Sequence, residues 1–164
     1  MRKPAFFAYK YLHALRGNAI ACSDNETFAA SDGARTAVLI WDWRQPVQAV
    51  SDRPFYTRVL PAGPAAPAHL RFTHLAPGAY HLEMHRTGYR ANDAYSAYLD
   101  MGSPPNLNAK QLETLNQLTR DAPQIARVVQ VAVTGKLNVA LALHTNDIML
   151  VTLTSIKAAR ASRP

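Results

Sequence analysis

The sequence has 164 residues, 48% of them hydrophobic, and a formal net charge of +7 at pH 7. This length and composition are typical of one folded domain with at most a small appendage, and they exclude a fibrous or largely disordered chain. The charge lies at the two ends: segments 1–23 and 148–164 contain basic residues and no acidic ones, whereas the part between them has eleven of each sign. A nucleic-acid-binding stripe of Lys and Arg is therefore not expected.

The composition also argues against other classes of partner. Cys22 has no second cysteine to pair with and is interpreted as a small buried residue, and no cysteine and histidine cluster has the spacing of a zinc site. No apolar run is long enough to span a membrane, and the basic N-terminus lacks the apolar core of a signal peptide. We expect no membrane association and no cofactor, and the location stays open between cytoplasm and periplasm.

The first predicted element is a helix, because Pro4 suits its first turn, apolar residues recur at helical spacing, and Gly17 suits its end. Beyond it the pattern changes to strands. A hairpin is expected around the turn at 31–33, with 36–41 as its apolar second strand, and a further strand is expected at 55–60 before a proline-rich loop.

The clearest alternation of apolar and polar residues lies further along the chain. Residues 70–73 and 80–85 alternate on the two sides of a turn, which predicts a second hairpin. Three more apolar segments follow at 129–133, 137–143 and 148–153. Many short strands joined by turns indicate an antiparallel β-sandwich, so the predicted fold class is mainly β, with an N-terminal helix and a two-helix insertion.

The helical insertion is expected at about residues 92–119. Asn92 is interpreted as the N-cap of its first helix, which Gly102 ends, and Asn108 with Gln111 has the pattern of a capping box at the start of the second helix. A long loop structured in this way more often serves a site or an interface than a simple connection.

Residues that could carry chemistry are few. His81, Glu83 and His85 share one face of a predicted strand, but same-face neighbours lie about 6.6–7 Å apart, so a polar outer face is favoured over a metal site. None of the three Glu residues stands in a setting typical of the paired carboxylates of a glycosidase. Motifs for phosphate binding, dinucleotide binding or a nucleophile elbow are absent. The sequence therefore predicts no catalytic residue and no metal ligand.

One stretch is specific enough to suggest a family. Residues 88–102, GYRANDAYSAYLDMG, continue into SPPNLNAKQL at 103–112. This stretch resembles the C-terminal region of glycoside hydrolase family 39, the β-xylosidases, where an Asn-x-Tyr helix runs into Met-Gly-x-Pro and a second helix. In the same order, segments 3–12, 37–41 and 75–80 resemble the last helix of the family's catalytic barrel, its first long sandwich strand, and the hairpin before the Asn-x-Tyr helix.

The resemblance implies a larger enzyme, in which a (β/α)8 barrel carries an acid/base Glu and a nucleophile Glu and hydrolyses xylosides with retention. The match begins at the last barrel helix, so neither catalytic Glu corresponds to a residue of this sequence. The implied organisation is a barrel helix at 1–17, an accessory β-sandwich at 18–157 and a basic tail at 158–164. This chain is accordingly predicted to be inactive alone.

In such an enzyme, the insertion is expected to lie against the barrel near the mouth of the pocket. Five of its residues are candidates for shaping entry or holding the interface: Tyr89, Arg90, Asn92, Asp93 and Tyr95. The alternative is a purely structural role, with Asn92 as a helix cap, Tyr95 in the core, and Arg90 and Asp93 as a surface pair of little energetic value.

Without a barrel, the N-terminal helix is expected to expose an apolar patch formed by Phe6, Phe7, Tyr9 and Leu12. It should then fold back onto the sandwich, self-associate, or swap between copies. The expected partners are therefore a catalytic barrel or a second copy of the chain, with xylo-oligosaccharide as a candidate ligand.

Two other functions are kept as alternatives. One is a free-standing carbohydrate-binding or protein-interaction sandwich, and a sugar platform would then need exposed aromatics such as Trp41, Trp43, Tyr56 or Tyr89. Trp41 ends an apolar strand and is expected to be buried, which counts against this platform. The other alternative is a basic protein that binds through its charged ends.

Overall fold

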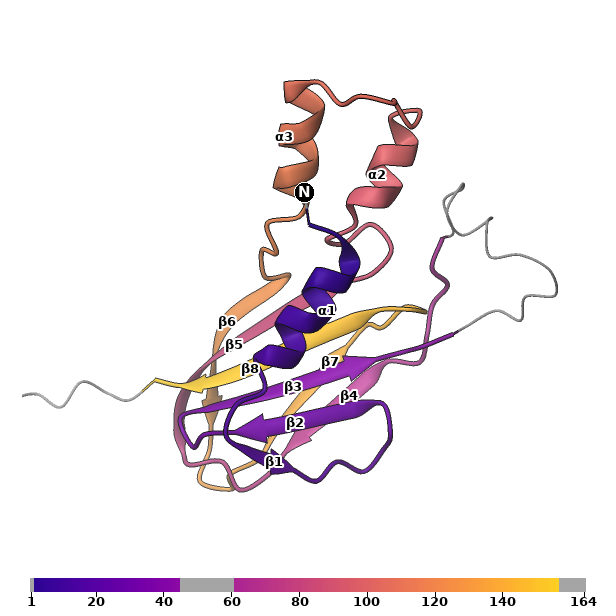
Figure 1. Ribbon diagram of the computed structural model, residues 1–164. Helices are drawn as coiled ribbons and strands as arrows, with labels where there is room; N and C mark the ends of the chain where they lie inside the picture. Colours follow the sequence, from indigo (N-terminus) through magenta and orange to yellow (C-terminus); the bar gives the residue numbers. More distant parts are fainter. Residues whose placement is uncertain (1, 45–60, 157–164) are drawn as a thin grey trace, which may run out of the picture.

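The computed structural model describes residues 2–44 and 61–156, and it confirms a mainly β fold of antiparallel strands with helices (Figure 1). The helices are α1 (Pro4–His13), α2 (Ala94–Asp100) and α3 (Ala109–Leu118). The strands are β1 (Asn18–Ile20), β2 (Thr27–Ser31), β3 (Arg35–Trp41), β4 (Ala68–Phe72), β5 (Gly78–Thr87), β6 (Ile125–Val131), β7 (Leu137–Leu141) and β8 (Ile148–Ser155). The strand expected at 55–60 and the tail expected at 158–164 lie outside the described residues.

The strands form two antiparallel sheets. The larger sheet has the order β1-β2-β3-β8-β5-β6, and the smaller one pairs β4 with β7. The C-terminal strand β8 lies between β3 and β5, with Val151 opposite both Val38 and Met84. The centre of the larger sheet is therefore built from three segments that lie far apart in the sequence.

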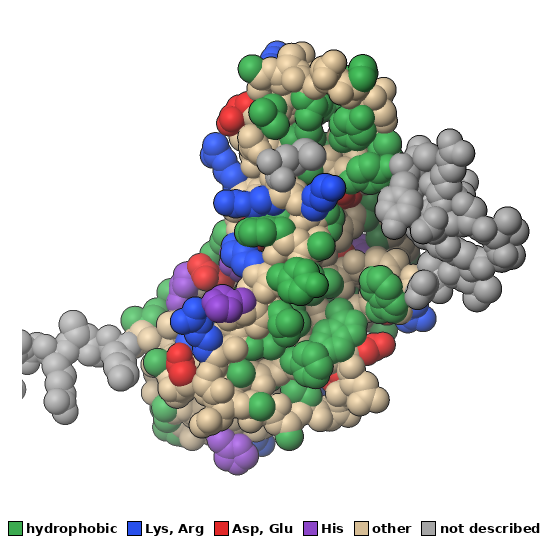
Figure 2. Space-filling model, viewed as in Figure 1, with side chains coloured by type: hydrophobic (Ala, Val, Ile, Leu, Met, Phe, Trp, Pro, Cys, Tyr) green, Lys and Arg blue, Asp and Glu red, His purple; other side chains and the backbone are tan. Residues whose placement is uncertain are grey.

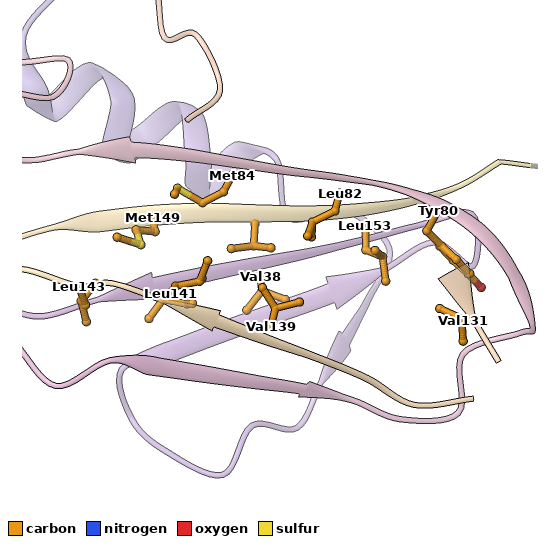
Figure 3. Close-up of a cluster of buried hydrophobic side chains, with 12 residues drawn as sticks. Val38, Tyr80, Leu82, Met84, Val131, Val139, Leu141, Leu143, Met149 and Leu153 are labelled. Atoms are coloured by element: carbon orange, nitrogen blue, oxygen red, sulfur yellow. The ribbon is translucent and has the colours of Figure 1, made fainter. Parts of the chain in front are cut away.

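Side chains from both sheets meet in one apolar core (Figure 3). The alternation of β5 is confirmed, because Tyr80, Leu82 and Met84 are all buried. The other buried members of this core are Val38, Ile40, Val131, Val139, Leu141, Leu143, Met149, Val151 and Leu153. Burying a side chain of this kind contributes about 1.5–3 kcal/mol, so this layer holds the two sheets together.

Helix α1 lies across the opposite face of the larger sheet (Figure 1). Phe7 and Tyr11, one helical turn apart, are completely buried against Leu39 and Leu150. The helix therefore folds back onto the sandwich, one of the outcomes expected for it. The expectation that Phe7 is exposed is wrong, because the buried stripe of α1 runs through Phe7 and Tyr11 and not through Tyr9 and Leu12. Strands β3 and β8 are covered on both faces, which explains their nearly continuous apolar sequences.

Other local expectations are also wrong. Strands β4 and β5 do not form a hairpin, because β4 pairs with β7 in the smaller sheet while β5 pairs with β6 and β8. Alternation shows which face of a strand is buried, but it does not show which strand lies beside it. Cys22 is exposed in the connection between β1 and β2, so it is not a buried residue. The capping box of Asn108 and Gln111 at the start of α3 is confirmed.

Candidate functional site

The helical insertion begins with a tight turn at the end of β5. The backbone amides and carbonyls of Gly88 and Ala91 bond each other reciprocally at 3.0 Å. Within this turn Arg90 has a φ of 56° and Asn92 a φ of 50°, both in the left-handed region. Residues with side chains seldom adopt this conformation unless surrounding contacts stabilise it, so the turn depends on what holds it.

Asn92 is buried and does not cap α2, so the structure corrects that prediction. Its Nδ2 donates to Asp121 Oδ1 at 2.7 Å, to the carbonyl of Arg86 at 2.9 Å, and to Tyr11 Oη at 3.3 Å. Its Oδ1 accepts from the backbone amide of Asp121 at 3.1 Å. Asn is among the few residue types that tolerate the left-handed region, and here it also connects three separate segments.

The N-cap of α2 is Asp93. Its Oδ1 accepts from the amides of Tyr95 and Ser96, each at 3.1 Å, and its Oδ2 accepts from the hydroxyl of Ser96 and from the amide of Arg90 at 3.2 Å. The expected surface pair between the side chains of Arg90 and Asp93 is therefore replaced by a contact to the Arg90 backbone. Asp93 positions both the turn and the first turn of α2.

Tyr89 and Arg90 form the outward side of the turn. The Arg90 guanidinium lies 5.3 Å from the centre of the Tyr89 ring and donates to its hydroxyl at 2.9 Å. It also donates to Asp100 Oδ2 at 2.7 Å, at the end of α2. These contacts are exposed, so they orient the side chain but contribute little stability. Tyr95 is half-buried and stacks on Tyr98, so the prediction of a core position for Tyr95 is only partly met.

Sequence reasoning missed Asp121, although it lies at the centre of this region. Its side chain is completely buried and accepts from Lys10 Nζ at 2.6 Å and from Tyr11 Oη at 2.5 Å. His85 Nδ1 lies 3.5 Å from Asp121 Oδ1 and donates to the backbone carbonyl of Asp121 at 3.0 Å. Asp121 lies three residues after the end of α3 and has no motif around it, so no local signal could have identified it.

The charges around Asp121 shift several pKa values. Burial alone raises the pKa of Asp121, but hydrogen bonds from His85, Lys10 and Tyr11 outweigh this effect and hold it below the ordinary range. The hydrogen bond to Asp121 raises the pKa of His85. Burial, followed by the hydrogen bond to Asp121 and its negative charge, raises the pKa of Tyr11, which stays a neutral phenol.

The row of His81, Glu83 and His85 is not a uniform polar outer face. His81 Nδ1 lies 3.7 Å from Glu83 Oε1 near solvent, whereas α1 covers His85, whose ring centre lies 6.3 Å from that of Tyr11. Within 2–44 and 61–156, no group of three His, Cys, Asp or Glu side chains is arranged to hold a metal ion.

A second feature is an apolar surface on the outer side of α1, which we call the α1 patch; it consists of Phe6, Tyr9, Leu12, Phe28 and Trp41. Tyr9 is 74% exposed and Phe28 is 55% exposed. Figure 2 shows hydrophobic side chains gathered over α1 and the strands beside it. A groove of about 260 Å³ crosses the patch, lined by Ala8, Tyr9, Leu12, Phe28, Leu39, Trp41 and Ile148. A contiguous apolar surface of this kind typically marks an interaction site.

The aromatic residues considered for a sugar platform are dispersed. Trp41 is half-buried rather than buried, and its ring is tilted by 52° against that of Phe28. Trp43 is exposed, Tyr89 lies in the turn that begins the insertion, and Tyr56 is outside the described residues. The tilted pair does not offer the flat surface on which a sugar ring would stack.

Among the described helices, none has the length and apolar character needed to span a membrane.

Solved structures show what this arrangement resembles. The GH39 enzyme from Xanthomonas axonopodis pv. citri is 50% identical to this chain, with a TM-score of 0.91, and the match covers 94% of this chain and 31% of that one. A monomeric β-xylosidase from Caulobacter crescentus CB15 is 48% identical, with a TM-score of 0.90 and the same coverage. This chain resembles one part of a family 39 glycoside hydrolase.

A GH39 β-xylosidase from Caulobacter crescentus agrees with this result at 39% identity and a TM-score of 0.72, over 94% of this chain and 28% of that one. No family model matches the chain, and a search of curated proteins found no match. The chain spans about a third of the length of the family 39 structures, so their activity and partners apply to it only as proposals.

Proposed function

We propose that this chain is the accessory β-sandwich of a family 39 glycoside hydrolase, which packs against a catalytic barrel that hydrolyses xylosides. The observation that carries this proposal is the match to two family 39 structures at 48% and 50% identity over 94% of the chain. Identity at this level over nearly the whole chain supports a common packing role as well as a common fold. The segments 1–17, 18–157 and 158–164 keep their proposed roles as barrel helix, sandwich and tail.

The two apolar sides of α1 support a packing role. One side buries Phe7 and Tyr11 in the sheet, while the other presents Tyr9 and Leu12 to solvent. A surface helix normally has one apolar stripe, and a helix that is apolar on opposite sides lies between two packed layers. We therefore place the catalytic barrel on the α1 patch. The Caulobacter relative described as monomeric favours a barrel over a second copy as the partner.

The five candidate residues of the insertion divide into two roles in this proposal. Asn92 and Asp93 position the turn through their buried and capping hydrogen bonds. Arg90 is exposed, and Tyr89 and Tyr95 are half-buried, so part of each side chain is accessible to a partner. In this proposal these three contact the barrel or shape the entry to its pocket. None of the five supplies a nucleophile or a general acid, and both catalytic carboxylates belong to the barrel.

Hydrolysis of an aryl β-xyloside tests the proposal. The purified chain should show no turnover above buffer, whereas the complete β-xylosidase from Caulobacter crescentus CB15 serves as the positive control. Turnover by this chain that is lost in the Glu83→Gln variant would overturn the proposal, because the chain would then carry its own catalytic carboxylate. Glu113→Gln is the matched control, since Glu113 is exposed on α3 and pairs with Arg120.

Addition of the chain to the Caulobacter crescentus CB15 β-xylosidase lacking its matching third tests the packing role. We expect a 1:1 complex, detected by light scattering, that recovers hydrolysis lost on truncation. Absence of a complex would contradict the placement of the barrel on this chain.

A further inference from the structure

A junction of polar side chains, all of them largely buried except the half-exposed Lys10, links α1 to the turn that begins the helical insertion. Its members are Lys10 and Tyr11 from α1, His85 from β5, Asn92 from the turn, and Asp121 after α3. These segments lie as many as 111 positions apart in the sequence. The junction is distinct from the α1 patch, because it lies on the sheet side of the helix.

Tyr11 and Asn92 bind the same atom. The hydroxyl of Tyr11 and the amide of Asn92 both donate to Asp121 Oδ1, at 2.5 Å and 2.7 Å, while Lys10 donates to Oδ2 at 2.6 Å. Asn92 Nδ2 also lies 3.3 Å from the Tyr11 hydroxyl. The helix and the turn are therefore joined through one carboxylate and by a direct contact.

Release of α1 would change this junction in a defined way. Asp121 would lose Lys10 and Tyr11, and its side chain is completely buried. Water would enter as the helix leaves and would compete with Asn92 for the carboxylate, because a charge left unpaired away from water is strongly unfavourable. Asn92 would lose its contact with the Tyr11 hydroxyl, and its hydrogen bond to Asp121 would weaken. These are two of the side-chain contacts that hold its left-handed backbone.

We propose that the Asp121 junction is a coupling device, in which docking of α1 on the sheet fixes the conformation of the turn at 88–93. A partner that binds the outer side of α1 and holds the helix in place then also orders Tyr89 and Arg90. The reverse holds as well, because coupling between two sites is reciprocal. Asp121 acts in this device as a positioning residue.

Hydrogen exchange of the isolated chain tests the coupling. The variant Phe7→Ala removes an apolar contact between α1 and the sheet and so weakens the docking of the helix. The Phe7 side chain is not part of the polar junction. We expect about ten-fold faster exchange at the amides of Gly88, Ala91 and Asp121, whose acceptors lie in or against the turn. The β4–β7 amides should not change. If Phe7→Ala does not fold, Phe7→Leu provides the same readout with a smaller loss of volume.

Two further variants separate coupling from a general loss of stability. Tyr11→Phe removes only the hydroxyl and should accelerate exchange at the same three amides while α1 stays docked. Val139→Ala creates a cavity in the core remote from α1 and should accelerate exchange throughout the sandwich. Faster exchange in α1 without a change in the turn would overturn the proposal, as would an equal acceleration everywhere in Phe7→Ala. The result does not depend on the proposed enzyme partner, because only this chain is measured.

Discussion

The hydroxyl of Tyr11 lies 2.5 Å from the carboxylate of Asp121, a residue 110 positions further along the chain. This contact explains why α1 buries a tyrosine rather than a second phenylalanine at the position one turn after Phe7. The ring fills the apolar interface with the sheet, while the hydroxyl satisfies a charge that the same helix covers. Tyr11 therefore fixes α1 on the sandwich in two ways, through apolar packing of its ring and through the hydrogen bond of its hydroxyl.

Removal of the Asp121 carboxylate should lower stability markedly. Asp121→Ala leaves the buried hydroxyl of Tyr11 without its acceptor and removes the shortest of the hydrogen bonds that Asn92 Nδ2 donates. We expect a loss of about 2–4 kcal/mol in the free energy of unfolding. Urea titration followed by tryptophan fluorescence measures this change. The control is Asp100→Ala, which removes an exposed pair with Arg90 and should leave the free energy of unfolding nearly unchanged. Equal losses in the two variants would contradict a special role for Asp121.

Stability should also depend on pH through His85. Because the pKa of His85 is raised on folding, its contribution is fully present below the ordinary histidine value of about 6.5 and is lost as the pH rises through the folded value. The charged or titratable groups that face it are Lys10, Tyr11 and Asp121. The pKa of Asp121 is lowered on folding, so its contribution to stability is lost only in strong acid. The pKa of Tyr11 is raised, so its titration changes stability only in alkali.

The free energy of unfolding should accordingly fall from pH 6 to pH 8.5. Urea titrations of the wild type and of His85→Gln at both pH values provide the measurement, and the variant should show a smaller fall. His69→Gln, an exposed change on β4, should keep the wild-type slope. A slope that is unchanged in His85→Gln would assign the pH dependence to another group.

The α1 patch should make the isolated chain associate as its concentration rises. Replacing Tyr9 and Leu12 by Ser removes exposed apolar area without touching the buried side of the helix. Light scattering between micromolar and submillimolar concentrations should show association of the wild type and a monomeric double variant. The matched control replaces Val128 on β6 and Val133 just after it by Ser. These two side chains are 57% and 89% exposed, and the control should associate like the wild type. A wild type that stays monomeric throughout would argue against the patch as an interface.

Xylo-oligosaccharides should not bind the isolated chain. The tilted rings of Phe28 and Trp41 do not form a flat surface on which a sugar could stack. Tyr89 does not extend this surface, because it lies in the turn between β5 and α2. Calorimetry with xylohexaose at millimolar concentration should show only the heat of dilution. A saturable heat that disappears in Trp43→Ala would instead support a free-standing carbohydrate-binding module.

The turn at the start of the insertion should not tolerate a side chain at Gly88. A Cβ at this position would lie 2.0 Å from Asp147 Oδ1, a buried atom that also accepts from Arg86 at 2.9 Å. Gly88→Ala should therefore destabilise the chain by about 1–3 kcal/mol, measured by thermal unfolding. Gly63→Ala is the control and should be nearly neutral. Apart from its chain neighbours, no atom of residues 2–44 and 61–156 lies within 4 Å of an added Cβ there. If Gly88→Ala is as stable as the wild type, Asp147 must move aside without weakening its hydrogen bond from Arg86.

Much of the architecture could be predicted from the sequence, because it is encoded in local patterns. The alternation of Tyr80, Leu82 and Met84 indicated the buried face of β5, and Asn108 with Gln111 indicated the start of α3. Both signals depend on residues within a few positions of each other, so they can be recognised in the sequence without knowledge of the tertiary structure. The stretch at 88–102 likewise indicated family 39, since its residue types and spacing are contiguous in the chain.

Tertiary structure decided which segments lie together. Nothing near β4 indicates that it pairs with β7 rather than β5, and the two sides of α1 look equally apolar until the sheet selects Phe7 and Tyr11. Asn92 satisfies every local rule for a helix cap, yet Asp93 takes that role while Asn92 turns inward to Asp121. Local sequence determined which elements form and which family they resemble. The polar junction and the apolar patch arise only when segments distant in the chain exclude water together, so the folded structure alone shows them.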